Sequence, residues 1–253
     1  MTIRIAMWSG PRNLSTAMMR SFGSRADTFV SDEPFYGCFL KGAGSGHPMR
    51  DETIGAMDCD WGSVMQTLRG PIPEGQSLDR GTVPDIWYQK HMWHHMTGPI
   101  GYGDFTGFTH AFLIREPERM IASYLRKREA AAFEDFGLER QAEFFGREAD
   151  RLGRAPPVVD ANDVLTNPEM VLSKLCTALG IPWDLAMLSW APGRRETDGP
   201  WAPHWYGAVE RSTGFGPPET GPVGLPDAAR RLADRCRPYY ERLAEHRLRG
   251  AEP

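Results

Sequence analysis

The sequence predicts an α/β fold of three layers, in which helices flank a mainly parallel central sheet. Three segments carry this prediction, because each reads as a short buried strand, a loop and an amphipathic helix. They span residues 4–17, 108–125 and 157–180. The chain has 253 residues, 41% of them hydrophobic, which suits one large core. We therefore expect a single domain over residues 1–253.

The first of these segments predicts a site for an anion. Residues 4–9 (RIAMWS) predict a strand, a Gly-Pro turn follows, and a helical pattern begins near Ser15. The first turn of a helix has free N–H groups and a positive dipole end, so it attracts phosphate or sulfate. The Arg12 guanidinium can fork onto an oxyanion, and the hydroxyls of Ser15 and Thr16 add donors. The alternative is an ordinary capped turn.

The same loop lacks the pattern that binds Mg-ATP. An ATP-binding loop reads G-x-x-x-x-G-K-[ST], and its lysine contacts the β- and γ-phosphates. Residues 10–16 read GPRNLST, without the Gly-Lys pair. We therefore expect the bound anion to be something other than Mg-ATP.

The second segment predicts a strand over residues 108–114 and a helix that starts at Pro117. Arg115 lies at the carboxyl end of this strand, where open α/β sheets bind ligands, and Ser123 lies two turns into the helix. Both side chains are candidates for anion binding. The structural alternative is a strand-end ion pair and a hydroxyl on the helix surface.

The remaining predicted elements are scaffold. Residues 157–160 predict a strand, and the next helix has Asn167 as its N-cap, Pro168 as its first residue and Gly180 as its C-cap. A C-terminal helix begins at Asp227, and Pro238 is expected to kink it.

Residues 11–16 (PRNLST) resemble the Pro-[Lys/Arg]-Ser-Gly-[Ser/Thr]-Thr loop of the sulfotransferases that use 3′-phosphoadenosine-5′-phosphosulfate (PAPS). The resemblance implies a P-loop-type fold, with the 5′-phosphosulfate held by Arg12, Ser15 and Thr16, which match family positions. Asn13 replaces the serine of the family, and it too is expected to bind the donor as part of this loop. Leu14 replaces the glycine of the family. Because glycine permits backbone conformations that leucine resists, a different local shape of the loop is expected.

The resemblance continues, discontinuously, to about residue 183. The Arg-x-Pro-x-x-x-x-x-Ser-Tyr pattern of residues 115–124 is similar to the family's 3′-phosphate site, which implies that Arg115 and Ser123 bind that phosphate. Residues 194–201 (RRETDGPW) lie where the family places cations and an aromatic ring near the 3′-phosphate and adenine. This implies donor contacts from Arg194, Arg195 and Trp201. An exposed basic turn beside a packing tryptophan is the alternative.

Two residues are candidates for the catalytic base. Residues 86–88 (IWY) predict a strand that places Lys90 and His91 near its end, loosely similar to the strand-end Lys-Thr-His of cytosolic sulfotransferases. In that motif His is the base and Lys contacts the phosphosulfate. Adjacent strand residues face opposite sides, so only one of the two is expected to face the site. Glu33, after a predicted strand at residues 28–30, is the second candidate, because some bacterial and Golgi members use a carboxylate.

The spacing of His91, His94 and His95 can suit a metal, but the glutamate of an H-E-x-x-H motif is missing, so no metal is expected. The net charge of −4 provides no basic field for nucleic acid. No apolar run approaches the ~18 residues that span a membrane, and no signal peptide is evident. The four dispersed cysteines favour a reducing cytoplasm, as in the bacterial cytoplasmic members that the chain resembles.

The expected function is transfer of a sulfonate group from PAPS to a hydroxyl or amine of a small molecule or glycan. Residues 42–104 and 192–224, rich in Gly, Pro and aromatic residues, are expected to form loops around the acceptor and donor. Two alternatives remain open. One is a P-loop kinase-like phosphoryl transferase, and the other is a catalytically inactive nucleotide-binding or scaffold module.

Overall fold

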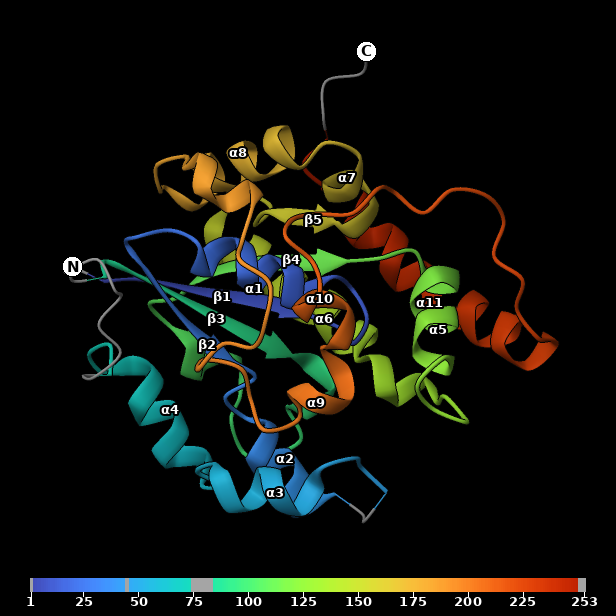
Figure 1. The fold of residues 1–253 in the computed structure, drawn as a ribbon, viewed down its shortest axis with the longest axis horizontal. Coiled ribbons are helices and arrows are strands. Elements are labelled where there is room, and N and C mark those ends of the chain that lie inside the picture. Colours follow the sequence, from blue (N-terminus) through green and yellow to red (C-terminus); the bar gives the residue numbers. More distant parts are fainter. Residues whose placement is uncertain (1, 44–45, 74–83, 250–253) are drawn as a thin grey trace.

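Five parallel strands form the central sheet of the computed structural model, which describes residues 2–43, 46–73 and 84–249 (Figure 1). The strand order is β2-β3-β1-β4-β5. The bounds of the strands are β1 Ile3–Ser9, β2 Thr28–Asp32, β3 Ile86–Met92, β4 Thr109–Ile114 and β5 Val158–Asp160. The expected α/β architecture with a parallel sheet between helices is confirmed.

Helices cover both faces of this sheet (Figure 1). On one face α1 (Ser15–Gly23) and α8 (Pro168–Leu179) pack against Ile5, Met7 and Tyr88. On the other face α4 (Trp61–Arg69) and α6 (Leu138–Leu152) pack against Trp8, Trp87 and Phe112. A third apolar cluster joins α5 to the C-terminal helix, with bounds α5 Pro117–Leu125 and α11 Asp227–Ala244.

The shorter helices lie around the carboxyl edge of the sheet and in its connections. Their bounds are α2 Tyr36–Gly42, α3 Arg50–Ala56, α7 Ala161–Thr166, α9 Ala202–Trp205 and α10 Gly207–Glu210. Four short 3-10 helices complete the described elements, with bounds η1 Trp93–His95, η2 Tyr102–Phe105, η3 Phe133–Phe136 and η4 Leu185–Leu188.

Local chemistry explains where the predicted elements start and stop. The Asn167 side chain accepts a hydrogen bond from the Met170 N–H at 3.2 Å, and Gly180 ends α8 in the left-handed conformation with φ 72°. Pro117 opens α5 as expected, and α11 continues across Pro238. Residues 44–45 and 74–83 of the predicted loop stretch 42–104 lie outside the described residues.

Strand β3 is longer than the sequence predicted. It runs through Lys90 and His91 to Met92, because its backbone pairs with β1 on one side and β2 on the other. Inside a paired strand, side chains alternate strictly between the two faces. Lys90 therefore shares the face of Tyr88 and α1, whereas His91 shares the face of Trp87 and α6.

Two glycines flank α6 in the same left-handed conformation but in different surroundings. Gly137, before the helix, has φ 62°, and Gly153, after it, has φ 63°. A Cβ on Gly137 would lie 2.7 Å from the Trp93 Cβ and 2.8 Å from the His94 backbone nitrogen, whereas a Cβ on Gly153 meets nothing within 4 Å. The close approach at Gly137 joins α6 to the end of β3.

We expect Gly153→Ala to lower the free energy of unfolding by about 1–2 kcal/mol, the cost of a left-handed alanine. Gly137→Ala should cost about 1–3 kcal/mol more, because the new methyl group also overpacks the contact with Trp93. Urea denaturation of both variants measures the difference. Equal losses would show that the contact at Gly137 contributes nothing.

Candidate active site

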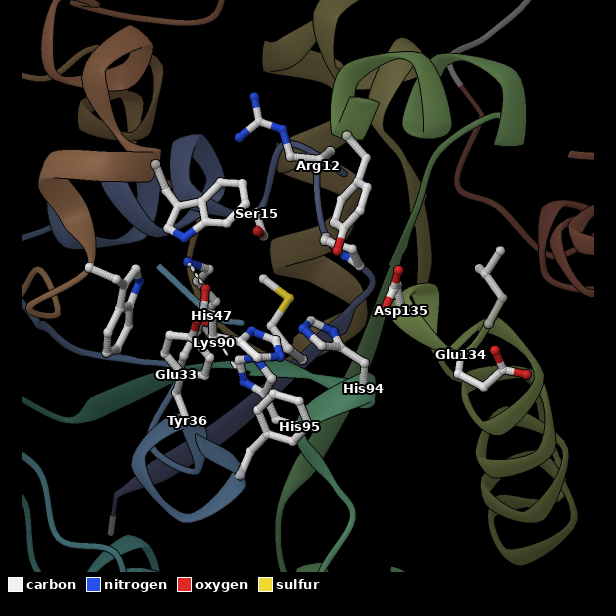
Figure 2. A pocket seen from close by; sticks show the side chains of 18 of the residues that line it. Arg12, Ser15, Glu33, Tyr36, His47, Lys90, His94, His95, Glu134 and Asp135 are labelled. Atoms are coloured by element: carbon white, nitrogen blue, oxygen red, sulfur yellow. Dashed lines mark ion pairs between the residues drawn. The ribbon is translucent and has the colours of Figure 1, made fainter. Parts of the chain in front are cut away.

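A cavity of about 440 Å³ opens at the carboxyl ends of β1, β2 and β3 (Figure 2). Its walls come from the loop after β1, the end of β2, the end of β3, the turn before α6 and the segment around α9. Parallel α/β sheets bind ligands at this edge because the loops that follow the strands converge there. Six of the predicted site residues line this cavity: Arg12, Ser15, Thr16, Glu33, Lys90 and Trp201.

The loop between β1 and α1 has the geometry of an anion-binding turn. Within the described ranges, the first turn of α1 has no side-chain cap at its N-cap residue Leu14, so its N–H groups are available to a ligand. Leu14 takes φ 71° and ψ 7°, the left-handed conformation that glycine tolerates best, and its side chain packs against the core. Asn13 is fully buried, and its amide atoms have no hydrogen-bond partner among the described residues.

The structure brings the two predicted anion-binding segments together. The Arg12 Nε donates a hydrogen bond to the Ser123 Oγ at 3.1 Å, and the Arg115 Nη1 donates to the Arg12 carbonyl at 2.5 Å. Burial and the neighbouring cations Arg115 and Arg126 lower the pKa of Arg12. Like charges gathered in this way form an attractive position for an anion. The other side of Arg115 pairs with the carboxylate of Glu219.

A buried cluster of charges forms the floor of the cavity. The Lys90 Nζ lies 2.8 Å from Asp32 Oδ1 and 2.7 Å from Glu33 Oε1. Lys90 is 1% exposed, and both carboxylates are buried as well. Glu33 has φ 44°, which is costly for a non-glycine residue and is most often found at functional sites. In this conformation the Glu33 side chain lines the cavity and pairs with Lys90.

The charged groups of this cluster shift one another's pKa values. Burial raises the pKa of Glu33, and the Asp32 carboxylate adds to the rise while Lys90 opposes it. Burial disfavours the charge on Lys90, but the two carboxylates outweigh burial and hold the pKa of Lys90 above its ordinary value. Glu33 is therefore an unusually basic carboxylate beside a fixed cation, which is the electrostatic setting of a general base.

His91 does not line the cavity. Its ring is stacked on Trp8, with 4.6 Å between ring centroids, and its Nε2 lies 3.2 Å from the Gln89 Oε1. Burial lowers its pKa to about 3, so the imidazole is neutral. The structure thus separates His91 from Lys90 and Glu33, since it lies on the opposite face of the sheet.

His94 and His95 line the cavity instead. Their ring centroids are 4.1 Å apart, and the His95 ring stacks on Tyr36 at 4.3 Å. Burial lowers the pKa of His94 to about 3 and that of His95 well below its ordinary value. Among the described residues, no group of three or more metal-binding side chains converges.

The segment around residue 200 reaches the cavity through its aromatic residues rather than its arginines. Trp201 lines the cavity and is 1% exposed. Arg194 is exposed, and Arg195 donates to the Ala191 carbonyl at 2.5 Å, so neither is among the lining residues. Of the three residues that the sequence motif singled out in this segment, Trp201 lies at the cavity wall, whereas Arg194 and Arg195 do not.

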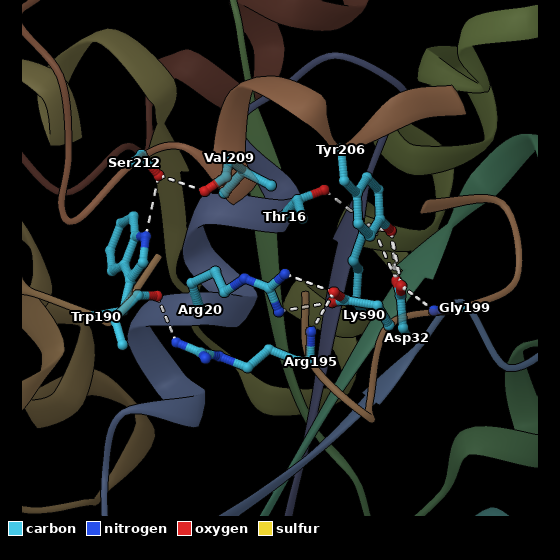
Figure 3. A network of polar contacts seen from close by, with 12 residues as sticks. Thr16, Arg20, Asp32, Lys90, Trp190, Arg195, Gly199, Tyr206, Val209 and Ser212 are labelled. Carbon is cyan, nitrogen blue, oxygen red and sulfur yellow. Dashed lines mark hydrogen bonds and ion pairs between the residues drawn. The ribbon is translucent and has the colours of Figure 1, made fainter. Parts of the chain in front are cut away.

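Residues 198–206, which we call the clasp, are bound to the sheet by buried polar contacts (Figure 3). Arg20 of α1 pairs with Asp198 through two contacts of 2.6 Å each. The Gly199 N–H donates to the Asp32 Oδ2 at 3.1 Å, and the Tyr206 hydroxyl donates to the same carboxylate. The sequence analysis assigned no role to Asp32 or Tyr206. The only signal for Asp32 was its position at the end of a strand, beside Glu33.

A family model described as "Sulfotransferase domain" matches residues 3–246 of this chain. Two relatives from Arabidopsis thaliana, named branched-chain-amino-acid aminotransferase-like proteins 1 and 2, are 34% and 33% identical to it over 242 and 243 residues. Each alignment covers 96% of this chain but only 42% and 41% of the relatives. The chain therefore spans less than half the length of these relatives.

Solved sulfotransferase structures share the fold. The sulfotransferase domain of the Synechococcus PCC 7002 olefin synthase superposes with a TM-score of 0.51 at 17% identity, over 92% of this chain and 94% of that one. A sulfotransferase from Alicyclobacillus acidocaldarius gives 0.52 at 14% identity, over 97% and 95%. In the described part of the chain, no helix combines the length and hydropathy that a bilayer crossing needs.

The Arg20–Asp198 pair allows a test of how firmly the clasp is held. Removing one partner of a buried ion pair leaves an uncompensated charge, so Asp198→Ala should lower the free energy of unfolding by about 3–5 kcal/mol. The matched control is Glu143→Ala, which breaks an exposed pair with Arg147 and should cost about 0.5 kcal/mol or less. Chemical denaturation compares the two, and similar losses would contradict a firmly held clasp.

Proposed function

This chain belongs to the sulfotransferase domain family, and we propose that it transfers a sulfonate group from PAPS to a hydroxyl or amine of a small-molecule or glycan acceptor. One observation carries the proposal. The anion-binding loop with Arg12 and the buried pair of Glu33 and Lys90 face the same cavity, so a donor held by the first places its sulfonate near the second.

The proposed donor lies along the carboxyl edge of the sheet. Its 5′-phosphosulfate contacts the first turn of α1, with donors from Arg12, Ser15 and Thr16 and from the buried Asn13 amide. Its 3′-phosphate takes the position between Arg115 and Ser123, both of which contact Arg12. Trp201 lies on the side where the adenine would be held. Arg194 and Arg195 do not line the cavity, so the proposal does not use them.

The proposed reaction is a direct displacement at sulfur. The acceptor oxygen or nitrogen forms a bond to sulfur as the bond between sulfur and the 5′-phosphate oxygen breaks, and that oxygen keeps the electron pair. The acceptor proton moves to the Glu33 carboxylate, and the Lys90 ammonium offsets the negative charge on the transferring group. Adenosine 3′,5′-bisphosphate (PAP) leaves, and no metal takes part.

The orientation of side chains on β3 supports Glu33 over His91 as the base. Glu33 lines the cavity and has a raised pKa, whereas His91 lies on the other side of the sheet. We therefore assign the base to Glu33. A protonated carboxyl accepts no proton, so the rate should fall as the pH drops through the pKa of Glu33, which lies above that of an exposed glutamate.

Two further statements belong to this proposal. The working compartment is the cytoplasm, a reducing setting that suits four cysteines present as free thiols. The aminotransferase activity suggested by the names of the plant relatives describes proteins of which this chain covers less than half, so it is not carried over.

Differential stabilisation tests the donor and separates the rival functions. Ligands that bind the native state raise the melting temperature by mass action. PAP should raise it and Mg-ATP should not. A shift with Mg-ATP alone favours the kinase-like alternative, and no shift with either ligand favours the inactive scaffold. Sulfonate transfer is then measured with labelled PAPS and a panel of phenols, alcohols, amines and oligosaccharides.

Arg12→Ala should weaken PAP binding about 10- to 100-fold, the scale of a lost charge-assisted hydrogen bond. Isothermal titration calorimetry measures this change. Arg147→Ala serves as the control, because that arginine is exposed on α6 and pairs only with Glu143 and the Tyr102 ring among the described residues. An unchanged affinity in Arg12→Ala would remove Arg12 from the donor site.

Glu33→Gln should lower kcat by about 10²- to 10⁴-fold while PAP affinity changes little, since it removes the base and keeps the shape of the side chain. His91→Phe preserves stacking on Trp8 and should keep turnover close to that of the wild type. Fixed-time assays with labelled PAPS measure the turnover of both variants. The opposite pattern, with loss in His91→Phe alone, would return the base to His91.

A further inference from the structure

The Tyr206 hydroxyl makes a complete set of hydrogen bonds at the centre of the charge cluster. Figure 3 shows those with Lys90 and Asp32. It accepts one from the Lys90 Nζ at 2.5 Å and one from the Trp201 Nε1 at 3.0 Å. It donates its own proton to Asp32, whose carboxylate oxygens lie 2.7 and 2.9 Å away. A hydroxyl has one proton to donate and two lone pairs that accept, so the hydrogen-bonding capacity of the Tyr206 hydroxyl is fully used.

The same contacts account for the three protons of the Lys90 ammonium. They point to Asp32, Glu33 and Tyr206, at 2.8, 2.7 and 2.5 Å. The Thr16 hydroxyl, at 3.4 Å, is a weaker fourth neighbour. A lysine side chain has several rotatable bonds, and an ammonium group turns freely unless its protons are bound. Among the described residues, the Tyr206 oxygen is the nearest neutral partner of Lys90, so it fixes the ammonium without adding another charge.

We propose that Tyr206 is a positioning residue of this active site, which holds Lys90 between Asp32 and Glu33 and so sets the charge that the base experiences. This inference rests on the proposed function, in which Glu33 is the base. Tyr206 comes from the clasp, which is anchored at Asp198 by Arg20. The clasp therefore supplies part of the catalytic cluster as well as part of the cavity wall.

Several groups face Glu33 from the elements packed around it. Lys90 comes from β3, Asp32 from β2, Tyr36 from α2, His95 from η1 with its Nδ1 at 3.7 Å, and Tyr206 from the clasp. Lys90 and the Tyr206 hydroxyl lower the pKa of Glu33, whereas burial and Asp32 raise it. Burial and the two carboxylates raise the pKa of Tyr206 itself well above its ordinary value, so this hydroxyl stays protonated.

These opposing effects give Tyr206→Phe and Asp32→Asn opposite expected outcomes. Tyr206→Phe removes only the hydroxyl, so Asp32 loses one of its donors while keeping the Gly199 N–H, and Lys90 then turns toward Asp32. The pKa of Glu33 should rise by about one unit, the scale of a lost hydrogen bond to a charged group. Asp32→Asn removes a negative neighbour, so the pKa of Glu33 should fall.

The experiment is a carbon-13 carboxyl NMR titration of Glu33 in the full chain, which requires no turnover. Tyr88→Phe is the matched control. Tyr88 lies on the same strand and face as Lys90, is fully buried, and has a hydroxyl without a hydrogen-bond partner among the described residues. Tyr88→Phe should leave the titration of Glu33 unchanged. An unchanged titration in Tyr206→Phe, or the same shift in Tyr88→Phe, would overturn the proposal.

Turnover provides a second readout. Tyr206→Phe should lower kcat about tenfold and move the acidic limb of the kcat profile to higher pH, with KM for PAPS changed less than about threefold. If Tyr206→Phe fails to fold, site-specific replacement of Tyr206 by difluorotyrosine keeps the ring and makes the hydroxyl oxygen a weaker acceptor from Lys90. The Glu33 titration should then move to higher pH, as in Tyr206→Phe, and no movement would contradict the proposal.

The two proposals fail in different ways. A wild-type protein that transfers no sulfonate from PAPS to any acceptor in the panel overturns the proposed function. The NMR titrations still decide whether Tyr206 positions Lys90. Conversely, active wild-type enzyme with an unshifted Tyr206→Phe titration leaves the transferase proposal standing and removes Tyr206 from its mechanism.

Discussion

The buried pairing of Lys90 with Asp32 and Glu33 is the interaction on which the site depends. The parallel register of β2 and β3 places Asp32 directly beside Lys90, so the sheet itself supplies the first pair. Taking an ammonium and two carboxylates out of water is costly unless each is paired and hydrogen-bonded. The structure meets this requirement with contacts from Tyr206, Gly199 and Thr16, which bind the clasp and α1 to the same cluster.

Left-handed backbone at three non-glycine residues surrounds this cluster. Arg12, Leu14 and Glu33 have φ values of 62°, 71° and 44°. Each such residue costs of order 1–3 kcal/mol, and such strain persists only where the surrounding contacts fix it. Here the strained residues are those that turn the chain at the ends of β1 and β2. The backbone strain is therefore located in the segments whose side chains line the cavity.

Local patterns predicted the scaffold well, including the strand, loop and helix of residues 3–23. The strand starts, the Asn167 cap and the grouping of Arg12 with Ser123 and Arg115 follow from short-range chemistry and from a family motif. The face of the sheet that each side chain takes was harder to predict, because the length of β3 depends on its neighbours in the sheet. Since β3 extends through both residues, His91 and Lys90 point to opposite faces. The role of Tyr206 was beyond prediction, since its charged partners Lys90 and Asp32 are 116 and 174 residues away in sequence.

Helix α1 serves both ends of this arrangement. Its N-terminus faces the anion loop, and near its other end Arg20 holds Asp198. An exchange of loops between homologous proteins, whether by recombination or by design, would therefore leave a buried charge unpaired if it carried position 198 without position 20. The two positions have to be exchanged together, although 178 residues separate them in the sequence.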